Sequence, residues 1–517
     1  MLKKLPIGIQ TFKKIRSEDY LYVDKTKIAL ELISNNSYIF LSRPRRFGKS
    51  LFIDTIHNIY EGYKEYFKDL HIYDNWDWDI KYPVIKISFA GIFENKESTK
   101  DIIISILDKN KERLQLDFNP SAEVSTYFNQ LINKASEKYN QKVVILVDEY
   151  DKPILDNIEK IDIAKDIRDT LKGFYSQIKD NDEFVKFCML TGVSKFSRVS
   201  IFSGLNNLKD ISLNEDFGDI CGYTQNDLET VFYPYLKDID IDKLKEWYNG
   251  YNFLGEKVYN PYDILLFIDN KKKFANYWFE TGSPSFLINL IKKNNYFVPE
   301  FSNLIIEEKD INSFDIENLN LTTIMIQSGF LTIKEMKQKR DRFYYILDFP
   351  NKEVRLSFYD YILQRFSSND NISISDDLYD IFEDANLEQL KNTIKRLFSS
   401  IAYNNFTNNE IENYEGFYAS VFFTYFAALG CELIAEDVTN KGRIDLTIKF
   451  NDRVYIFEFK ITKGDPLEQI KEKKYYEKYL STSKDVYIIG VVFDPKERNI
   501  SAFEVEKVVE NAEYINL

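Results

Sequence analysis

The sequence is poor in the residues that usually hold structural metals or cross-link a fold. Its 517 residues include only three cysteines and two histidines. Cys188, Cys221 and Cys431 lie far apart and form no C-x-x-C pair, and His57 and His71 are the only imidazoles. The sequence therefore predicts neither a structural zinc site nor a disulfide framework.

Long apolar segments and positive charge are also scarce. No stretch approaches 18 uninterrupted apolar residues, and the N-terminal residues lack the continuous apolar run of a signal peptide, so we expect a cytoplasmic protein without a membrane span. The 82 acidic residues outnumber the 68 lysines and arginines, which gives a net charge of −14. Because nucleic-acid phosphates bind mainly Lys and Arg, this balance argues against a broad basic surface, and any contact with DNA or RNA must be a local patch.

One loop has the residues of a phosphate-binding site. An apolar run at 38–41 is followed by a turn, and Gly48-Lys49-Ser50 then opens an apolar-periodic segment, which predicts strand, loop and helix. The helix N-terminus would offer free N–H groups to phosphate oxygens, while Lys49 would reach the β and γ phosphates and Ser50 would hold Mg²⁺. Arg43 stands where the general pattern has its first glycine, so a chance match is the alternative.

A second element fits this loop. Residues 143–147 form an apolar run that ends in Asp148 and Glu149, as in a buried parallel strand with carboxylates at its C-terminal edge. Asp148 could join the Mg²⁺ shell, and Glu149 could polarise an attacking water. The alternative, a core strand followed by a polar turn, explains the apolar run but not its pairing with a lysine loop.

Strands and helices alternate around these two motifs. Further strands are expected at 84–89 and 184–191, and amphipathic helices at 102–116 and 125–139. This alternation predicts an α/β unit with a mostly parallel sheet covered on both faces.

The last part of the chain predicts a different α/β unit. A helix at 413–429 precedes strands at 431–437, 443–450 and 453–461, and a helix at 466–480 and a strand at 486–493 follow. Asp445 stands on the second strand and Glu458-Phe459-Lys460 on the third, with twelve residues between Asp445 and Glu458. This αβββαβ order with Asp and Glu-x-Lys resembles the core of the restriction-endonuclease-like fold.

The alternation of side chains along the third strand indicates that Glu458 and Lys460 are more than a surface charge pair. Glu458 and Lys460 share one face with Val454 and Ile456, while the other face is apolar throughout. Buried charges are costly unless they are paired or bound to a metal. A Glu458–Lys460 pair with a purely structural role is the alternative. In a nuclease, Asp445, Glu458 and the Phe459 carbonyl would bind Mg²⁺, and Lys460 would position the attacking water.

Three segments together resemble a known family. Residues 41–51 read Leu-Ser-Arg-Pro-Arg-Arg-Phe-Gly-Lys-Ser-Leu, residues 147–154 read Val-Asp-Glu-Tyr-Asp-Lys-Pro-Ile, and residues 190–197 read Leu-Thr-Gly-Val-Ser-Lys-Phe-Ser. They resemble the AAA-ATPase-like family of prokaryotic proteins, whose members commonly carry a C-terminal PD-(D/E)XK nuclease-superfamily domain. In that family arginines replace the early loop glycine, so Arg43 is expected there.

The resemblance implies further site residues. It places Thr191 at a γ-phosphate sensor position, although a Thr-Gly strand exit is common. Arg198 could supply a charge-stabilising arginine within a subunit or between subunits, in competition with Arg45 and Arg46. The resemblance also adds Glu415 to the acidic cluster, with Gln469 on the following helix completing the nuclease site. The local basic patch would comprise Lys471, Lys473 and Lys474, for which a solvated face is an equal alternative.

The predicted domains follow from these motifs. We expect a P-loop AAA-ATPase-like domain at 1–235, a mainly helical lid with a winged-helix-like hairpin at 236–366, and a PD-(D/E)XK nuclease-like domain at 404–517. Residues 367–403 would provide a linker and a connecting helix, because 367–377 are polar, acidic and aperiodic.

The combined prediction is an ATP-binding protein that acts as an ATPase and is coupled to a Mg²⁺-dependent nuclease. The nuclease is expected to act on DNA in preference to RNA. The resemblance implies a defence or mobile-element context. A homo-oligomer is expected if the arginine comes from a neighbouring subunit. The main alternative is a non-catalytic ATP-dependent switch or scaffold whose last domain only binds nucleic acid or a protein. The expected ligands of the nucleotide are Arg45, Arg46, Phe47, Gly48, Lys49, Ser50, Leu51 and Thr191.

Overall fold

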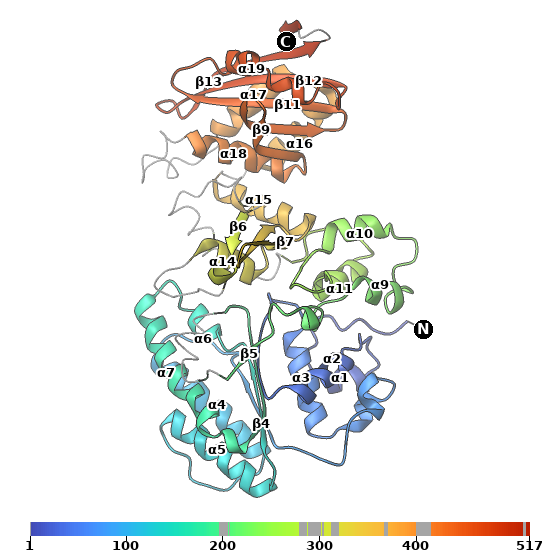
Figure 1. The fold of residues 1–517 in the computed structure, drawn as a ribbon, viewed down its shortest axis with the longest axis vertical. Helices are drawn as coiled ribbons and strands as arrows, with labels where there is room; N and C mark the ends of the chain where they lie inside the picture. The colour runs from blue at the N-terminus through green and yellow to red at the C-terminus, as the bar shows by residue number, and fades with distance from the viewer. Residues whose placement is uncertain are drawn as a thin grey trace. The chain divides into compact units, whose positions relative to one another are not determined.

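The computed structural model divides the chain into two compact units. Residues Met1–Leu287 and Ile305–Lys352 form the first, and Ile288–Leu304 and Glu353–Leu517 form the second. The structure describes residues 2–195, 205, 207–278, 287, 301, 304–311, 320–366, 371–399, 415–509 and 513–516, and among these the side chains of 364–366, 371–377, 415–417, 513 and 516 are not described. Each unit has its own sheet (Figure 1).

The first unit is built on a five-stranded parallel sheet. Its strands run in the order β2-β3-β4-β1-β5, and every neighbouring pair is parallel. A parallel sheet is covered on both faces, so its strands are apolar on both sides, and all six residues of β3 are buried. The bounds are β1 Tyr38–Ser42, β2 Val84–Ser88, β3 Val143–Asp148, β4 Val185–Gly192 and β5 Lys209–Asp210.

Helices cover both faces of this sheet. Helices α4, α5 and α7 lie on one side, and α1, α2 and α3 lie on the other (Figure 1). The predicted parallel, doubly covered α/β sheet is thereby confirmed. The bounds are α1 Phe12–Ser17, α2 Thr26–Asn35, α3 Lys49–Tyr60, α4 Lys96–Arg113, α5 Val124–Tyr139, α6 Lys152–Leu155 and α7 Ile161–Asp180.

After the sheet the first unit continues with short helices and a hairpin. Thr224 caps α9 by accepting a hydrogen bond from the Asp227 backbone N–H at 3.1 Å, as expected of an N-cap threonine. The hairpin expected within 236–366 is β7–β8, which follows helix α14, and β6 completes a three-stranded sheet of order β6-β8-β7. The bounds are α9 Gln225–Thr230, α10 Ile241–Tyr248, α11 Pro261–Asp269, β6 Leu304–Glu307, α13 Glu308–Ile311, α14 Leu321–Ser328, β7 Thr332–Lys339 and β8 Arg342–Asp348.

The second unit is built on a six-stranded sheet of order β14-β13-β12-β11-β10-β9. Only β11 and β12 pair in parallel, and α19 forms the crossover between them. Helices α18 and α19 lie on opposite faces of the sheet (Figure 1). Phe422 of α18 packs against Phe457 and Phe459 of β11. The expected αβββαβ core is confirmed, and β13 and β14 extend it. The bounds are α15 Lys352–Phe366, α18 Glu415–Ala428, β9 Glu432–Thr439, β10 Gly442–Phe450, β11 Arg453–Ile461, α19 Pro466–Lys473, β12 Asp485–Asp494, β13 Asn499–Val509 and β14 Glu513–Asn516.

The prediction of an irregular linker at 367–377 is wrong for residues 371–377, which are helical. Helix α16 runs from Asn371 to Asp384, and α17 follows at Leu387–Ser399 as the connecting helix. Phe382 in the second half of α16 packs against Tyr455 and Phe450 of the sheet. Because adding residues to an existing helix costs little, this packing extends the helix through a polar segment that has no apolar stripe of its own.

Candidate active sites

The predicted phosphate loop connects β1 to α3. The turn after Ser42 ends at Gly48, whose φ of 91° lies in the left-handed region that favours glycine, and Lys49 and Ser50 then open the helix. The first N–H groups of a helix have no intrahelical partner. The loop therefore presents backbone donors and a lysine at the carboxyl edge of the parallel sheet, where ligands of such folds bind.

Arg43 explains how the loop forms without its usual first glycine. The side chain is 1% exposed, and its Nη1 donates to the carbonyls of Ser42 and Ser212 at 2.9 and 2.7 Å. Nη2 donates to the Phe217 carbonyl at 2.9 Å, and the guanidinium lies 4.0 Å from the Phe253 ring centroid. Burial lowers its pKa to about 10, which still leaves it charged at neutral pH. Arg43 thus fastens the loop to the 212–218 segment.

A cavity of about 510 Å³ lies beside the loop, within the size range of small-molecule sites. Arg46 lies over the Tyr262 ring, with its guanidinium carbon 4.6 Å from the ring centroid. Cationic and hydroxyl side chains along one wall suit a polyphosphate. Of the residues expected from the sequence, the cavity is lined by Arg45, Arg46, Gly48, Lys49, Ser50, Leu51 and Glu149.

Phe47, which the sequence predicts as a nucleotide ligand, does not line the larger cavity. Its ring is buried and packs edge-on against Tyr251 and Phe253, with centroid distances of 4.7 and 5.7 Å. Phe47 lines a smaller, mostly apolar cavity of about 70 Å³ that shares Gly48 and Leu51 with the larger one. Residues 21–23 line this smaller cavity too, so this N-terminal segment lies beside the loop.

Lys49 is held inside the loop by its own backbone. Its Nζ donates to the carbonyls of Arg43 and Pro44, both at 2.9 Å. Burial lowers the pKa of Lys49, and the nearby Asp148 charge opposes this. A phosphate oxygen could replace either carbonyl, because an ammonium group has three donors without fixed directions.

The carboxylates at the end of β3 lie opposite this lysine. Asp148, the candidate metal ligand, accepts a hydrogen bond from the Thr191 hydroxyl at 2.8 Å. Neither Asp148 nor Thr191 is part of the cavity wall. Glu149 lines the cavity, and its φ of 56° is unusual for a residue other than glycine. Burial and the charge of Asp148 raise the pKa of Glu149, which suits a residue that accepts a proton from water.

Sequence reasoning missed other residues that line this cavity. Asp151, Lys152, Val193 and Tyr262 lie on its wall. Asp151 and Lys152 directly follow the acidic strand end, but nothing in their spacing indicated that they would turn back toward the loop. Arg198 lies outside the described residues.

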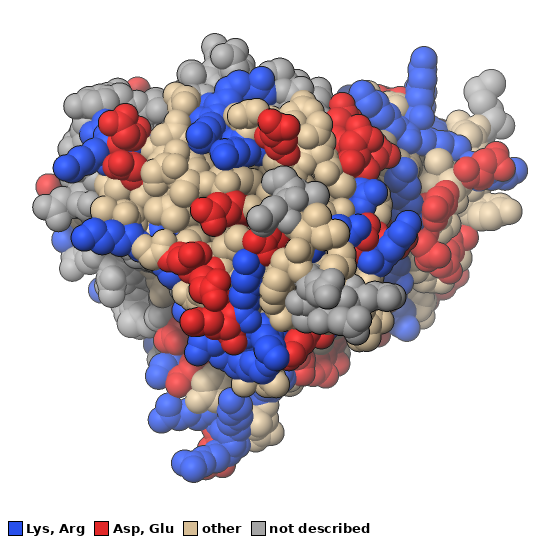
Figure 2. Space-filling view, turned by 90° about the horizontal axis from the view of Figure 1, so that it is seen from above, with Lys and Arg blue, Asp and Glu red and all other residues tan. Residues whose placement is uncertain are grey.

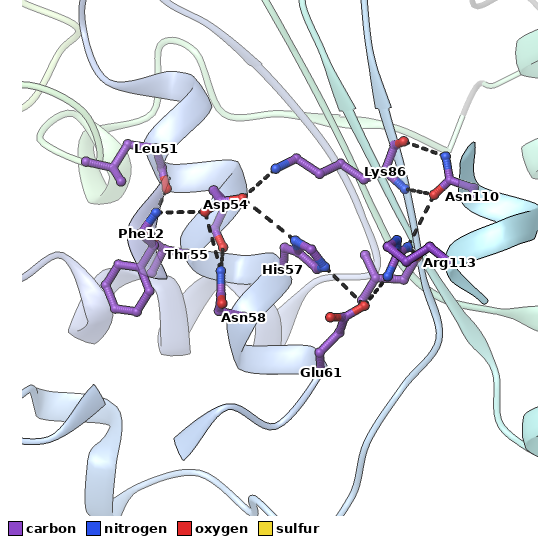
Figure 3. A network of polar contacts seen from close by, with 11 residues as sticks. Phe12, Leu51, Asp54, Thr55, His57, Asn58, Glu61, Lys86, Asn110 and Arg113 are labelled. Carbon is purple, nitrogen blue, oxygen red and sulfur yellow. Dashed lines mark hydrogen bonds and ion pairs between the residues drawn. The ribbon is translucent and has the colours of Figure 1, made fainter. Parts of the chain in front are cut away.

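A polar network beneath the loop fixes helix α3 to its neighbours (Figure 3). Asp54 of α3 accepts a hydrogen bond from the Phe12 backbone N–H at 2.7 Å and pairs with Lys86 of β2 at 2.5 Å. His57 Nε2 lies 3.1 Å from a Glu61 oxygen, and Glu61 also pairs with Arg113 of α4. The network ties the helix that carries Lys49 to β2, α1 and α4.

His57 belongs to this network and to no predicted site. Burial lowers its pKa, but hydrogen bonds to the carboxylates of Asp54 and Glu61 outweigh that effect and leave the pKa raised. His57 therefore links the carboxylates of Asp54 and Glu61 within this network.

The second site lies on β10, β11 and α19. Glu458 is 1% exposed, and Gln469 of α19 donates a hydrogen bond to its Oε1. Lys460 Nζ lies 3.5 Å from the same oxygen. Asp445 Oδ2 accepts a hydrogen bond from the Phe459 backbone N–H at 2.7 Å, which holds the aspartate beside the Glu-x-Lys strand. The structure thus brings together these four predicted side chains.

Glu458 retains free capacity for a cation. Within the described part of the chain, its buried Oε2 has no hydrogen-bond partner. Burial raises its pKa to about 8, with the Asp445 charge adding to the rise and Lys460 opposing it. Burial likewise raises the pKa of Asp445. Two neighbouring carboxylates that resist ionisation and leave a buried oxygen unpaired fit a hard divalent cation such as Mg²⁺, which prefers oxygen ligands.

One predicted contributor to this site, Glu415, is not placed by side-chain contacts. Glu415 is the first residue of α18, and its side chain is outside the described set. Among the described residues, no group of three or more metal-ligating side chains comes together. The described part of the site therefore supplies two carboxylates, with backbone carbonyls such as that of Phe459 as further candidates.

The proposed lysine patch on α19 is only partly available. Lys471 Nζ pairs with the buried Glu506 of β13 at 2.9 Å, and Lys474 lies 3.9 Å from Glu477. Lys473 is exposed. Figure 2 shows blue and red side chains interspersed on the face it presents, so the described residues of that face form no broad area of positive charge.

Comparisons with known proteins cover both sites. A family model described as "Predicted AAA-ATPase" matches residues 6–202, and a model of the PD-(D/E)XK nuclease superfamily matches residues 413–503. "Uncharacterized protein in vnfD 5'region" of Azotobacter chroococcum mcd 1 is 43% identical over 514 residues, which covers 98% of this chain and 99% of the relative. No solved structure matches the chain. The chain belongs to the family of AAA-ATPase-like proteins with a C-terminal PD-(D/E)XK nuclease-superfamily domain.

Proposed function

We propose that this protein binds and hydrolyses ATP at the β1–α3 loop and cleaves phosphodiester bonds, in DNA in preference to RNA, at the Asp445–Glu458 site. The observation that carries the nuclease half is the buried Glu458, whose Oε2 has no hydrogen-bond partner in the described part of the chain and which lies beside Lys460 and Gln469. The family adds support, because its two parts suggest an ATPase and a nuclease.

At the nucleotide site each residue has a distinct task. Lys49 and the N–H groups at the start of α3 bind the β and γ phosphates, with Arg45, Arg46, Gly48 and Leu51 along the same wall. Phe47 supports the loop from its apolar side. Ser50 and Asp148 are the candidate ligands of the nucleotide's Mg²⁺, which neutralises phosphate charge when bound.

Glu149 is the candidate base of this site. Its raised pKa and its place on the cavity wall suit a carboxylate that orients a water and accepts its proton. Thr191 acts through its hydrogen bond to Asp148 and fixes that carboxylate.

At the nuclease site Asp445, Glu458 and the Phe459 carbonyl would hold Mg²⁺, which polarises the phosphate and lowers the pKa of a bound water. Gln469 orients Glu458 through its hydrogen bond to Oε1 and leaves Oε2 available. Lys460 stabilises negative charge as the phosphodiester bond breaks. Glu415 remains a proposed third carboxylate.

The proposed organisation keeps four segments: the nucleotide domain at 1–235, the lid at 236–366, the connector at 367–403 and the nuclease domain at 404–517. We place the protein in the cytoplasm, consistent with the finding that none of the described helices has the length and apolar character needed to span a bilayer. Nucleotide occupancy would control nuclease activity, and the protein would act in defence or mobile-element biology. A homo-oligomer is proposed if an arginine acts across subunits.

One experiment tests both halves. Single- and double-stranded DNA and RNA are incubated with the full chain and Mg²⁺ or Mn²⁺, with and without ATP. Wild type, Asp445→Ala and Lys49→Ala are compared. Cleavage that Asp445→Ala abolishes supports the nuclease, while ATP binding without any cleavage supports the non-catalytic switch.

The same experiment tests the coupling of the two sites. Under the proposal, ATP changes the cleavage rate of wild type but leaves Lys49→Ala unaffected. Equal cleavage by wild type with and without ATP would overturn nucleotide control and leave two independent activities.

A further inference from the structure

Asp151 is a buried carboxylate on the wall of the nucleotide cavity, three residues beyond Asp148. It is 1% exposed, and its Oδ2 accepts hydrogen bonds from the Ser194 backbone N–H and hydroxyl, both at 2.6 Å. The Val193 N–H also donates to this carboxylate, at 3.1 Å to Oδ2. Asp151 follows β3 whereas Val193 and Ser194 follow β4, so one side chain links the turns after two neighbouring strands.

Further contacts connect the same two turns. The Tyr150 N–H donates to the Thr191 carbonyl, and the Tyr150 hydroxyl donates to the Ser194 carbonyl, both at 3.0 Å. Gly192 fits between the turns only because it has no side chain: an added Cβ would lie 2.5 Å from the Tyr150 ring and 2.6 Å from Asp151 Oδ1. Thr191 and Asp148 are joined at 2.8 Å. The turns therefore pack as one element.

Glu149 lies between these fixed points. Its φ of 56° places a non-glycine residue in the left-handed region, a conformation that persists only when its surroundings hold it. The preceding Asp148 is bonded to Thr191, and the following Tyr150 and Asp151 are bonded to residues 191–194. Freeing Asp151 would release one side of this restraint.

A charge in this position is costly for the fold. Burying a carboxylate requires hydrogen bonds to replace its lost hydration, and Asp151 obtains them from three donors on one neighbouring turn. Burial raises its pKa, and the bonds from Ser194 oppose the rise. Because these donors occupy its Oδ2, Asp151 is better suited to orient its neighbours than to bind the nucleotide's metal.

We propose that Asp151 is the positioning residue of the ATPase site, which keeps Glu149 directed at the attacking water by locking the turn after β3 to the turn after β4. The proposal rests on the proposed ATPase function. It assigns a role to Asp151, whose hydrogen bonds are made neither to the candidate metal ligands Ser50 and Asp148 nor to Lys49. Its signature is a loss of turnover without a matching loss of nucleotide binding.

The test uses Asp151→Asn in the full-length protein. The amide keeps the shape of the side chain but replaces one acceptor by a donor that faces N–H groups. We expect kcat for ATP hydrolysis to fall about 10- to 100-fold, the cost of misplacing a catalytic group, while the Kd for ATP changes less than about threefold. Asp162→Asn is the matched control. It removes an exposed charge on α7 at a position that is not part of the cavity wall, so kcat should change less than about threefold.

Ser194→Ala guards against misfolding of the first variant. It removes one of the three donors and should lower kcat about threefold to tenfold, with a melting temperature only a few degrees below that of wild type. The proposal is overturned if both variants hydrolyse ATP at the wild-type rate, or if the Kd for ATP rises in proportion to the fall in kcat.

A second readout separates this proposal from the ATPase assignment. If wild type binds ATP but hydrolyses none, the proposed ATPase function fails, and amide hydrogen exchange of the ATP-bound protein then decides the role of Asp151. Asp151→Asn should increase exchange in the 148–151 and 193–194 turns and leave β1 unchanged. Equal exchange in wild type and variant would overturn the link between the turns.

Discussion

The two candidate sites use carboxylates next to lysine in opposite ways. At the nucleotide site Asp148 and Asp151 both accept hydrogen bonds from protein donors, Asp148 from Thr191 and Asp151 from the 193–194 turn. At the nuclease site Glu458 keeps a buried oxygen without a partner in the described part of the chain, and its pKa rises to about 8. The carboxylates of the nucleotide site are thus held by hydrogen bonds. The free oxygen of Glu458 needs a cation or a proton.

The difference follows from the charge of the expected ligand. A nucleotide brings its own negative charge and its own metal, so the protein must supply cations and a rigid frame. A phosphodiester backbone brings no metal, so the protein must hold one with carboxylates that repel each other in its absence.

The largest effect is expected from Glu458→Gln. Removal of the carboxylate should lower metal-dependent cleavage about 10³-fold, since bound metal contributes several kcal/mol to such reactions. The variant should be at least as stable as wild type at pH 8, because a buried charge is removed. Cleavage assays and melting curves provide the measurement. Glu504→Gln, an exposed glutamate on the same sheet, is the control, and cleavage by Glu458→Gln within tenfold of wild type would contradict the assignment.

The second effect concerns the cation of the other site. Lys49→Ala should weaken ATP binding about 10- to 100-fold, the value of a lost charge-assisted hydrogen bond to phosphate. Isothermal titration calorimetry measures the Kd. Nucleic-acid cleavage by Lys49→Ala in the absence of ATP should equal that of wild type, because Lys49 belongs to the nucleotide site and not to the nuclease site. Lys134→Ala, which removes an exposed lysine paired with Glu137, controls for loss of charge, and unaltered ATP affinity in Lys49→Ala would refute the loop's role.

The third prediction uses the titration of Glu458. Its pKa rises from 4.5 to about 8 on folding, so between these values the folded state binds more protons than the unfolded state. This contribution to stability is complete below about pH 4.5 and is lost as pH rises through about 8. Without metal, the unfolding free energy of wild type relative to Glu458→Gln should therefore decrease over this range.

Mg²⁺ should reverse that trend. The cation replaces the proton on Glu458, so its affinity should rise about tenfold per pH unit as pH approaches 8. Melting temperatures with and without Mg²⁺ at pH 6 to 8.5 measure both effects. A wild-type pH dependence identical to that of Glu458→Gln would show that Glu458 ionises normally in the fold.

The smallest effect on either site is expected from Asp54→Asn, in the network beneath α3 (Figure 3). Losing the ion pair with Lys86 and weakening the bond from Phe12 should cost about 1 to 3 kcal/mol of unfolding free energy, while ATP affinity changes less than about threefold. Urea denaturation measures the first and calorimetry the second. The exposed Asp74→Asn is the control; a large loss of ATP affinity in Asp54→Asn would make the network part of the site.

Much of the fold could be predicted because its signals are local. The apolar runs of β1, β3 and β4 and the Glu-x-Lys strand β11 were each found within a few residues of their observed bounds. Glycine at 48 and acids at the end of β3 indicate a phosphate loop by themselves, since backbone geometry and strand polarity depend on neighbours in sequence. The polar start of α16 misled because its helical state depends on packing of its second half.

The two α/β units, the loop lysine and the paired acids of the nuclease strand follow from local patterns in the sequence. What those residues contact follows from the packing of the folded chain. In the folded chain the buried Arg43 donates a hydrogen bond to the Phe217 carbonyl, Lys471 pairs with Glu506, and Asp151 accepts a hydrogen bond from Ser194. The physical reason is distance along the chain: these partners lie between 35 and 174 residues apart, and a hydrogen bond between them exists only once the sheets have brought their strand ends together.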